Sequence, residues 1–127
     1  MKFLGTGSAL PKKVVSNDDL AQVMDTSDEW IRSRTGIGMR HIAVEETTTS
    51  MAVEAAEKAL ADAKISGCEI DLIIAGTISP DYIFPSLACE VQAAIGAKSA
   101  TAFDLSAGCS GFLFALANSK VCSKQLE

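Results

Sequence analysis

The second half of the chain alternates between helix-like and strand-like patterns of apolar residues. Thr48 or Thr49 is predicted to cap a long helix, because the apolar positions that follow recur every three or four residues and form a narrow, alanine-rich stripe. Gly67 is predicted to end this region. Residues 71–77 contain an uninterrupted apolar run, which is typical of a strand buried on both faces. The pattern therefore predicts a helix followed by a buried strand.

The same alternation continues towards the end of the chain. Residues 79–86 include two prolines and predict a loop, residues 87–95 predict a further helix, and residues 101–105 predict a second buried strand. A final helix is predicted from Cys109 towards Val121. Its first turns are so apolar that almost no polar face is left, so we expect other protein to enclose it.

The first half of the chain shows shorter patterns. Residues 2–7 predict a first strand, and Asn17 is predicted to cap a short helix. Thr26 and the glutamate three positions later have the spacing of a capping box, which predicts a second helix that ends at Gly36. Residues 39–44 predict an extended segment. Strands and helices in this order predict a layered α/β fold with a largely parallel sheet.

Length and composition narrow the class of protein. The 127 residues, of which 48% are hydrophobic, suffice for one compact unit with a real core. The net charge of −5, with no cluster of lysine and arginine, argues against a nucleic-acid partner. The first residues lack the pattern of a signal peptide, and no apolar stretch approaches the roughly 20 residues of a membrane span. We therefore expect a cytoplasmic protein with neither nucleic acid nor membrane as partner.

The four cysteines are expected to be reduced thiols in that compartment. No Cys-x-x-Cys pair occurs, and His41 is the single histidine, so no metal site is expected.

Cys109 is the best candidate for a nucleophile. It follows a predicted strand, lies beside the small residues Ala107 and Gly108, and precedes the predicted final helix. Unpaired backbone N–H groups and the positive end of the helix dipole favour the thiolate at such a position. The alternative is a buried structural cysteine, because free cysteines often fill protein cores. Such a role is what we expect of the other three, Cys68, Cys89 and Cys122.

Three segments together resemble one family. They are TSDEWIRSRTGI at residues 26–37, followed by RHI at 40–42; FPS at 84–86, followed by AC at 88–89; and FDLSAGCSGF at 103–112. With these motifs the chain resembles the β-ketoacyl-acyl carrier protein synthase III family of the thiolase-like superfamily, over residues 1–117. The resemblance implies a five-layered α/β sandwich built from two similar βαβαβαββ halves. Residues 1–127 are then an N-terminal thiolase-like half-domain that supplies most of the first half, with the second half absent.

The resemblance also implies a reaction. Such enzymes transfer an acyl group from acyl-coenzyme A to a cysteine and condense it with malonyl-acyl carrier protein, which loses carbon dioxide. Acyl-coenzyme A is thus a substrate, no cofactor is bound permanently, and acyl carrier protein is a partner. The reaction begins fatty acid synthesis.

Site residues follow from the same resemblance. Cys109 matches the acylated nucleophile, and its backbone N–H matches one donor to the oxyanion. Trp30 matches the residue that stacks on the adenine of coenzyme A, with Thr26 and Arg34 in the same binding stretch. Phe84 matches an aromatic residue that crosses the interface of a homodimer to line the partner's acyl pocket. Without the family, Trp30 would be interpreted as a core anchor, Arg34 as a solvated charge and Phe84 as a local hydrophobic plug.

Two features set this chain apart from the family pattern. The family's cysteine works with a histidine and an asparagine from the second half of a longer chain, and His41 is not expected to replace that histidine. The residues after Ala117 no longer resemble the family closely. We therefore expect an incomplete, poorly active fragment. The alternatives are a non-catalytic interaction half, which pairs with itself or with a separate second half, and another thiolase-like condensing enzyme.

Overall fold

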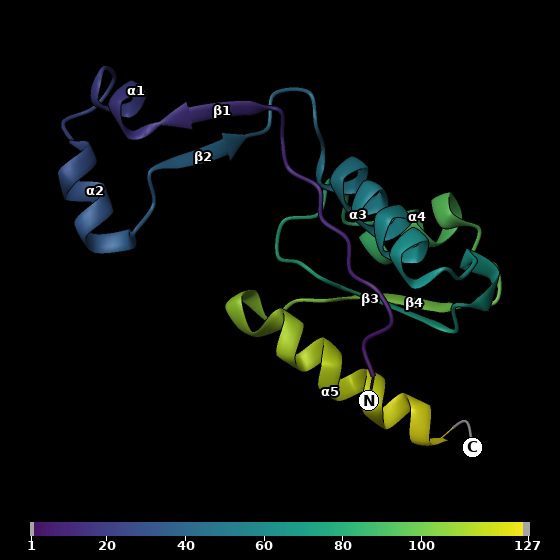
Figure 1. Cartoon of the computed structure of the whole chain (residues 1–127). Coiled ribbons are helices and arrows are strands. Elements are labelled where there is room, and N and C mark those ends of the chain that lie inside the picture. The colour runs from purple at the N-terminus through teal and green to yellow at the C-terminus, as the bar shows by residue number, and fades with distance from the viewer. Residues whose placement is uncertain (1, 126–127) are drawn as a thin grey trace. The chain divides into compact units, whose positions relative to one another are not determined.

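The computed structural model describes the backbone of residues 2–125 and the side chains of residues 2–122. The residues group into two compact units, one formed by Met1–Ala9 with Thr47–Glu127 and one by Leu10–Glu46. Each unit is described here by itself (Figure 1).

The larger unit is built on two parallel strands. β3 (Leu72–Gly76) pairs with β4 (Thr101–Leu105) in the register Leu72↔Thr101 to Gly76↔Leu105. The crossover between them contains α4 (Leu87–Ile95), which packs on both strands and on α3 (Thr48–Ala63). The predicted helices and strands of this region are confirmed. The strands are half-buried, however, and not buried on both faces as their sequence predicted.

The buried apolar side chains of the chain's described part all belong to α4 and the segment after it. They are Leu87, Ala88, Val91, Ala97 and Ala100. Small residues dominate this list, and they allow α4 to pack closely between α3 and the sheet.

The predicted strand at residues 2–7 is wrong, because this segment has no regular secondary structure. It lies instead against α3. A Cβ atom added to Gly7 would be 2.0 Å from the Ala55 carbonyl oxygen, and one added to Gly5 would be 2.5 Å from that of Ala59. The backbone N–H of Thr6 donates to Asp62 on the same helix. Two glycines thus let the chain touch the helix backbone, a contact that alternation of apolar residues does not reveal.

The caps of three helices lie one or two residues away from the predicted positions. Ser16, not Asn17, caps α1 (Asn17–Ala21) in a capping box with Asp19. Ser27, not Thr26, caps α2 (Asp28–Thr35), and Thr47 caps α3. In each case an adjacent hydroxyl competes for the same role, so sequence spacing alone does not choose between them.

The smaller unit consists of α1, α2 and an antiparallel pair of strands. β1 (Lys13–Ser16) pairs with β2 (Met39–Ile42), and Gly36 ends α2 with a φ of 73°, as predicted. Among the described residues, the sheets are therefore one parallel and one antiparallel pair. The parallel pairing that the sequence predicted is therefore found in the larger unit, whereas the strands of the smaller unit are antiparallel.

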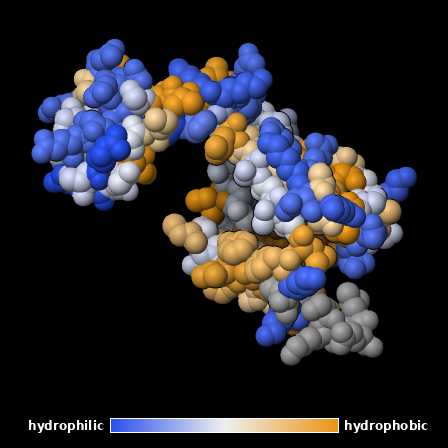
Figure 2. Space-filling model, viewed as in Figure 1, coloured by the Kyte–Doolittle hydropathy of each residue, from blue (hydrophilic) through white to orange (hydrophobic). Residues whose placement is uncertain are grey.

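The last helix begins after a single 3₁₀ turn. This turn, η2 (Gly108–Ser110), leads into α5 (Gly111–Gln125), which packs on β3 and β4. Phe112, Leu113 and Phe114 are all more than half exposed. Apolar side chains therefore gather on the surface along α5 (Figure 2). The expected enclosure is incomplete in this chain, because its own two-stranded sheet covers only one side of the helix.

Candidate functional site

Cys109 lies exposed in the turn between β4 and α5. Gly108 adopts a φ of 51°, a left-handed conformation that favours glycine, and the Ser110 N–H donates to the Ala107 carbonyl at 3.1 Å. Within residues 2–125 the Cys109 N–H has no hydrogen-bond acceptor. The cysteine therefore offers both its thiol and a backbone donor to an approaching group.

Two glycines bring this turn close to the sheet. Gly76 ends β3 and Gly111 begins α5, and a Cβ atom added to Gly76 would be only 3.3 Å from the Gly111 carbonyl carbon. The two backbones therefore approach each other directly. This contact places the start of α5, and the turn before it, at the carboxyl end of the parallel strands.

The other three cysteines differ from the expected buried fillers. Cys68 is exposed, and like Cys109 it is the middle residue of a three-residue 3₁₀ helix, η1 (Gly67–Glu69). Its thiol is 3.2 Å from the Ser66 hydroxyl and donates to it. Cys89 and Cys122 are half-buried. All four are free thiols. Cys68 is therefore a natural comparison for Cys109, since both are exposed in the same kind of turn.

Asp104 connects the strand before Cys109 to the loop that contains Phe84. This carboxylate on β4 accepts hydrogen bonds from the backbone N–H groups of Leu87 and Ala88 at 2.9 and 2.8 Å. Those two residues begin α4 immediately after the Phe84-Pro-Ser86 segment, whose Phe84–Pro85 peptide bond is cis. One carboxylate therefore satisfies two of the unpaired donors of α4 and fixes where the loop ends.

The opposite end of this loop is held by Asp81. Its carboxylate accepts from the N–H groups of Thr48 and Thr49 at 3.0 and 2.7 Å, at the start of α3. The Thr48 hydroxyl donates to the Ser79 carbonyl. Between these anchors, Ile83 is 100% and Phe84 87% exposed. The loop is thus bound to two helix starts while its apolar side chains point outward.

Trp30 and Arg34 form an exposed pair on α2. Trp30 is 54% exposed, and the Arg34 guanidinium carbon lies 4.4 Å from the centroid of its ring, a cation–π contact. An open depression of about 320 Å³ is lined by Asp25, Thr26, Ser27 and Trp30. A second, of about 260 Å³, is lined by Ser27, Glu29, Trp30, Ser33 and Arg34. Thr26 and Arg34, the other two predicted coenzyme-binding residues, therefore lie beside the exposed indole of Trp30, and Thr26 is half-buried.

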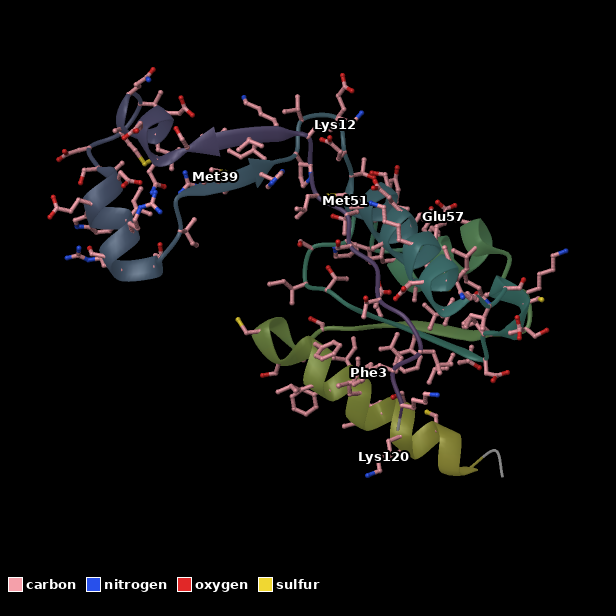
Figure 3. All side chains as sticks on the ribbon, in the orientation of Figure 1. Phe3, Lys12, Met39, Met51, Glu57 and Lys120 are labelled. Carbon is pink, nitrogen blue, oxygen red and sulfur yellow. The ribbon has the colours of Figure 1, made fainter. Side chains whose placement is uncertain are left out.

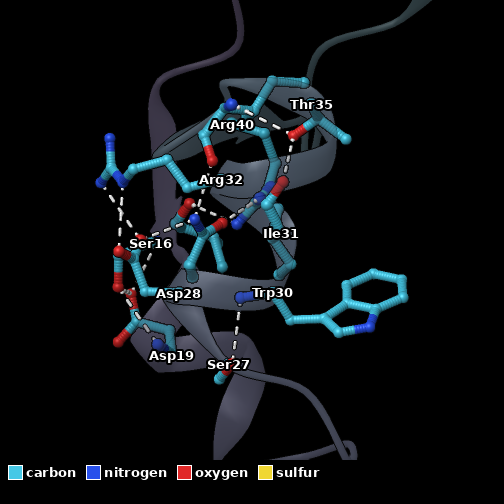
Figure 4. A network of polar contacts seen from close by, with 12 residues as sticks. Ser16, Asp19, Ser27, Asp28, Trp30, Ile31, Arg32, Thr35 and Arg40 are labelled. Carbon is cyan, nitrogen blue, oxygen red and sulfur yellow. Dashed lines mark hydrogen bonds and ion pairs between the residues drawn. The ribbon is translucent and has the colours of Figure 1, made fainter.

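A polar network supports α2 on the side away from the indole (Figure 4). Asn17 is its centre and is only 1% exposed. It bonds to Asp28 and Arg40, and Asp28 in turn bonds to Arg32 at 3.1 Å. Arg32 first and Asn17 second lower the pKa of the Asp28 carboxyl. The two arginines of α2 thus differ, since Arg32 pairs with a carboxylate while Arg34 lies over the indole.

His41 is on β2 of the smaller unit and is exposed. Its Nδ1 donates to the Pro11 carbonyl at 2.5 Å. This contact engages the ring with the backbone of its own unit.

The long-range contacts of Asn17, Asp81 and Asp104 were not predicted from the sequence, where Asn17 was expected only as a helix cap. Each makes contacts with residues 11 to 33 positions away, which no local motif encodes. Of the three, only Asp104 lies within one of the family motifs, the segment at residues 103–112 that contains Cys109. A polar residue in an otherwise apolar strand is a reason to search for a helix start that it caps.

Other functional groups are not found in the described part. Across residues 2–125 no cluster of three or more histidine, cysteine, aspartate or glutamate side chains could hold a metal ion. Among the described helices, none has the length and hydropathy to cross a membrane.

Known proteins resemble this chain closely. A β-ketoacyl-[acyl-carrier-protein] synthase III of Xylella fastidiosa is 56% identical over 116 residues, which are 91% of this chain and 36% of the relative. That of Streptococcus suis is 60% identical over 111 residues, 87% of this chain and 34% of the relative. No family model matches the chain. The chain thus spans little more than a third of the length of these curated relatives.

Solved structures agree with the sequence comparison. The 3-oxoacyl-[acyl-carrier-protein] synthase III of Aquifex aeolicus has a TM-score of 0.94 and 53% identity, over 98% of this chain and 40% of that one. The priming β-ketosynthase of the R1128 polyketide pathway has a TM-score of 0.86 and 40% identity, over 91% of this chain and 35% of that one.

These findings assign the chain a partial thiolase-like fold, which confirms the predicted fold class. More narrowly, it belongs to the β-ketoacyl-[acyl-carrier-protein] synthase III family. The comparisons do not favour a non-catalytic interaction half. They do not test the assignment of residues 1–127 as a half-domain, which stays a prediction, and the same holds for the individual site residues.

Acid should release the Phe84 loop from α3. The N–H and hydroxyl of Thr49 are the main groups that lower the pKa of Asp81 from 3.8 to about 2. A carboxyl with a depressed folded-state pKa stabilises the fold above its unfolded pKa, and this contribution disappears as the pH falls to the folded value. We expect the amide NMR signals of Thr48 and Thr49 to shift between about pH 4 and pH 2.

Asp81→Asn should remove this acid step, whereas Asp71→Asn, which neutralises an exposed carboxylate of the same unit, should retain it. An unchanged step in Asp81→Asn would show that another group anchors the loop.

Proposed function

We propose that this chain carries the coenzyme-A-binding and nucleophilic residues of a β-ketoacyl-acyl carrier protein synthase III. The observation that carries the proposal is the exposed Cys109 with a free backbone N–H, in the turn between a parallel strand and a helix. The motifs around it match relatives that are 53–60% identical and bear the synthase name.

In the first half-reaction, the Cys109 thiolate attacks the thioester carbonyl of acyl-coenzyme A. A carbon–sulfur bond forms to Cys109, and the bond to the coenzyme sulfur breaks. The proton lost by the cysteine is balanced by the one that the departing coenzyme thiolate takes up. The Cys109 N–H is one donor to the oxyanion of the tetrahedral intermediate.

In the second half-reaction, malonyl-acyl carrier protein loses carbon dioxide, and the resulting carbanion attacks the acyl-cysteine. A carbon–carbon bond forms, the Cys109 sulfur leaves as thiolate, and the product is a β-ketoacyl-acyl carrier protein. The family resemblance assigns the decarboxylation to a histidine and an asparagine from the second half of a whole synthase. The same resemblance does not match His41 to that histidine, so His41 is not assigned the role.

Coenzyme A binds at the indole of α2 in this proposal. The exposed face of Trp30 stacks on the adenine, Arg34 contacts a phosphate, and Thr26 lines the adjoining depression. No cofactor is held permanently, since coenzyme A enters and leaves as part of the substrate. We place the protein in the cytoplasm, where acyl carrier protein is its second substrate.

The exposed loop between β3 and α4 forms part of a homodimer interface. Ile78, Tyr82, Ile83 and Phe84 are all strongly exposed, and the two aspartate anchors hold the loop that presents them. Such a cluster is costly to leave in water. Phe84 would reach the acyl pocket of the partner.

Incubation with acetyl-coenzyme A should acylate Cys109. Intact mass spectrometry should show the addition of one acetyl group, and peptide mapping should locate it. Cys68 is the internal control, because it is also exposed in a 3₁₀ turn but has no helix directly after it. Cys109→Ala should abolish the modification. Labelling of Cys68 at the same rate, or of Cys68 and never Cys109, would contradict the assignment.

Removal of Trp30 or Arg34 should weaken coenzyme A binding. Loss of a charge-assisted contact typically costs about 1.5–3 kcal/mol, so Arg34→Gln should raise the Kd about tenfold or more in calorimetry. Trp30→Ala should raise it at least as much. Arg32→Gln removes the same charge two positions away, from an arginine paired with Asp28, and should have a smaller effect. Equal effects of the two arginine variants would show only a general dependence on charge.

Phe84→Ser should shift self-association towards the monomer in sedimentation or light scattering, because it removes an exposed aromatic side chain from the proposed interface. Phe3→Ser is the matched control, since Phe3 is also exposed but lies outside the loop (Figure 3). A chain that stays monomeric at all concentrations, or equal effects of the two variants, would contradict this interface.

A further inference from the structure

Asn17 is unusual because it is a buried polar residue in a unit with little buried apolar surface. It is 1% exposed, while large apolar side chains of the same unit, such as Val14, Ile37 and Met39, are exposed. A buried amide must have its hydrogen bonds satisfied, or it destabilises the fold. What Asn17 bonds to therefore determines how this unit is held together.

The Asn17 side chain uses both ends of its amide. Nδ2 donates to Asp28 Oδ1 at 2.8 Å and to the Ile37 carbonyl at 2.7 Å. Oδ1 accepts from Arg40, whose guanidinium also donates to the Val15 carbonyl at 3.2 Å. Only asparagine or glutamine combines two such donors with an acceptor, because an aspartate accepts only and an apolar residue does neither.

These partners lie at the two ends of α2. Asp28 is the first residue of the helix, and Ile37 directly follows Gly36, which ends it. One amide group therefore holds both ends of a helix of eight residues. Trp30 lies two positions after the first anchor, and Arg34 two positions before Gly36. A shift at either anchor would move the indole and the guanidinium together, relative to the strands of the smaller unit.

Asn17 does not reach the ligand-facing side itself. Figure 4 shows the indole of Trp30 projecting away from the polar network, on the opposite side of the helix from Asp28. The network also joins α2 to β2 through Arg40 and to β1 through Val15. The helix is thus fixed from its inner side, which leaves the outer side free for a ligand.

We propose that Asn17 is a positioning residue for coenzyme A: by holding both ends of α2, it keeps in place the helix that presents Trp30 and Arg34 to the adenine and phosphate groups. This inference rests on the proposed function, which assigns those two residues to coenzyme A. The inference goes beyond the proposed function because it assigns part of the affinity for coenzyme A to a residue that the ligand does not contact.

Asn17→Asp is the sharpest test, because it keeps the shape of the side chain and replaces its donors by an acceptor. The new carboxylate would face Asp28, with Arg40 the cation on its other side. Arg32 pairs with Asp28, and Asp18 and Asp19 are the neighbouring acids of α1. Two carboxylates in contact repel each other when both are ionised, and bond again when they share one proton.

We expect Asn17→Asp to raise the Kd for coenzyme A about tenfold or more near pH 7.5. The loss should shrink as the pH falls towards about 5, because the pair then takes up a proton. Trp30 is the only tryptophan of the chain, so its fluorescence reports binding directly. The ratio of variant to wild-type Kd at each pH cancels the titration of the ligand's own phosphates.

Two further variants separate positioning from general damage. Asn17→Asp combined with Asp28→Asn exchanges donor and acceptor between these two positions but leaves the Ile37 carbonyl without its donor, so it should recover part of the affinity at about pH 7.5. Asn118→Asp makes the same charge change on exposed α5 and should alter the Kd less than about twofold. If Asn17→Asp unfolds near neutral pH, the Kd of the double variant and the Kd values at the acidic end of the titration still test whether Asn17 positions α2.

Amide hydrogen exchange of Trp30 and Gly36 without ligand completes the experiment. If wild type binds coenzyme A and Asn17→Asp binds equally well, or the loss neither depends on pH nor recovers in the double variant, the inference fails while the proposed function stands. If wild type does not bind, the proposed function fails. In that case, the hydrogen-exchange protection factors of α2 decide whether Asn17 positions the helix. Factors that are lower in Asn17→Asp and recover in acid support this role, and unchanged factors overturn it.

Discussion

The larger unit depends on the carboxylate of Asp104, where the sheet is joined to a helix start. A parallel pair of strands needs a crossover helix on its face, and the first N–H groups of that helix have no partner within it. Asp104 supplies the acceptor from inside β4, so the negative charge also meets the positive end of the α4 dipole. The same residue precedes the Cys109 turn by a few positions. Helix packing, loop position and nucleophile therefore share one anchor.

Both units have few buried residues, and they are stabilised in different ways. The larger unit buries a few small apolar residues between α4, α3 and the sheet, where glycines and alanines bring backbones together. The smaller unit buries an asparagine and connects its elements by hydrogen bonds that start from that single side chain. Such polar centres tolerate few substitutions, since each donor must find an acceptor at a fixed place.

Periodic elements were predictable from sequence, and contacts between distant residues were not. The bounds of α4 and β4 agree with the prediction because period, proline and glycine signals coincide there. Residues 2–7 have the composition of a strand, yet two glycines place them against α3. Cys109 and Trp30 were found through motifs, whereas Asn17 and Asp81 act across gaps in sequence that only the fold closes.

The pairing of β3 with β4 has a consequence for the behaviour of the chain in solution. Among the described residues these strands pair only with each other, so each has one edge whose backbone N–H and C=O groups lack a neighbouring strand. Open edges beside apolar surface are templates for the addition of strands from other molecules. Because of these open edges, the chain should be purified at low concentration, and any complementary polypeptide should be added early. The same edges determine where such a polypeptide would extend the sheet.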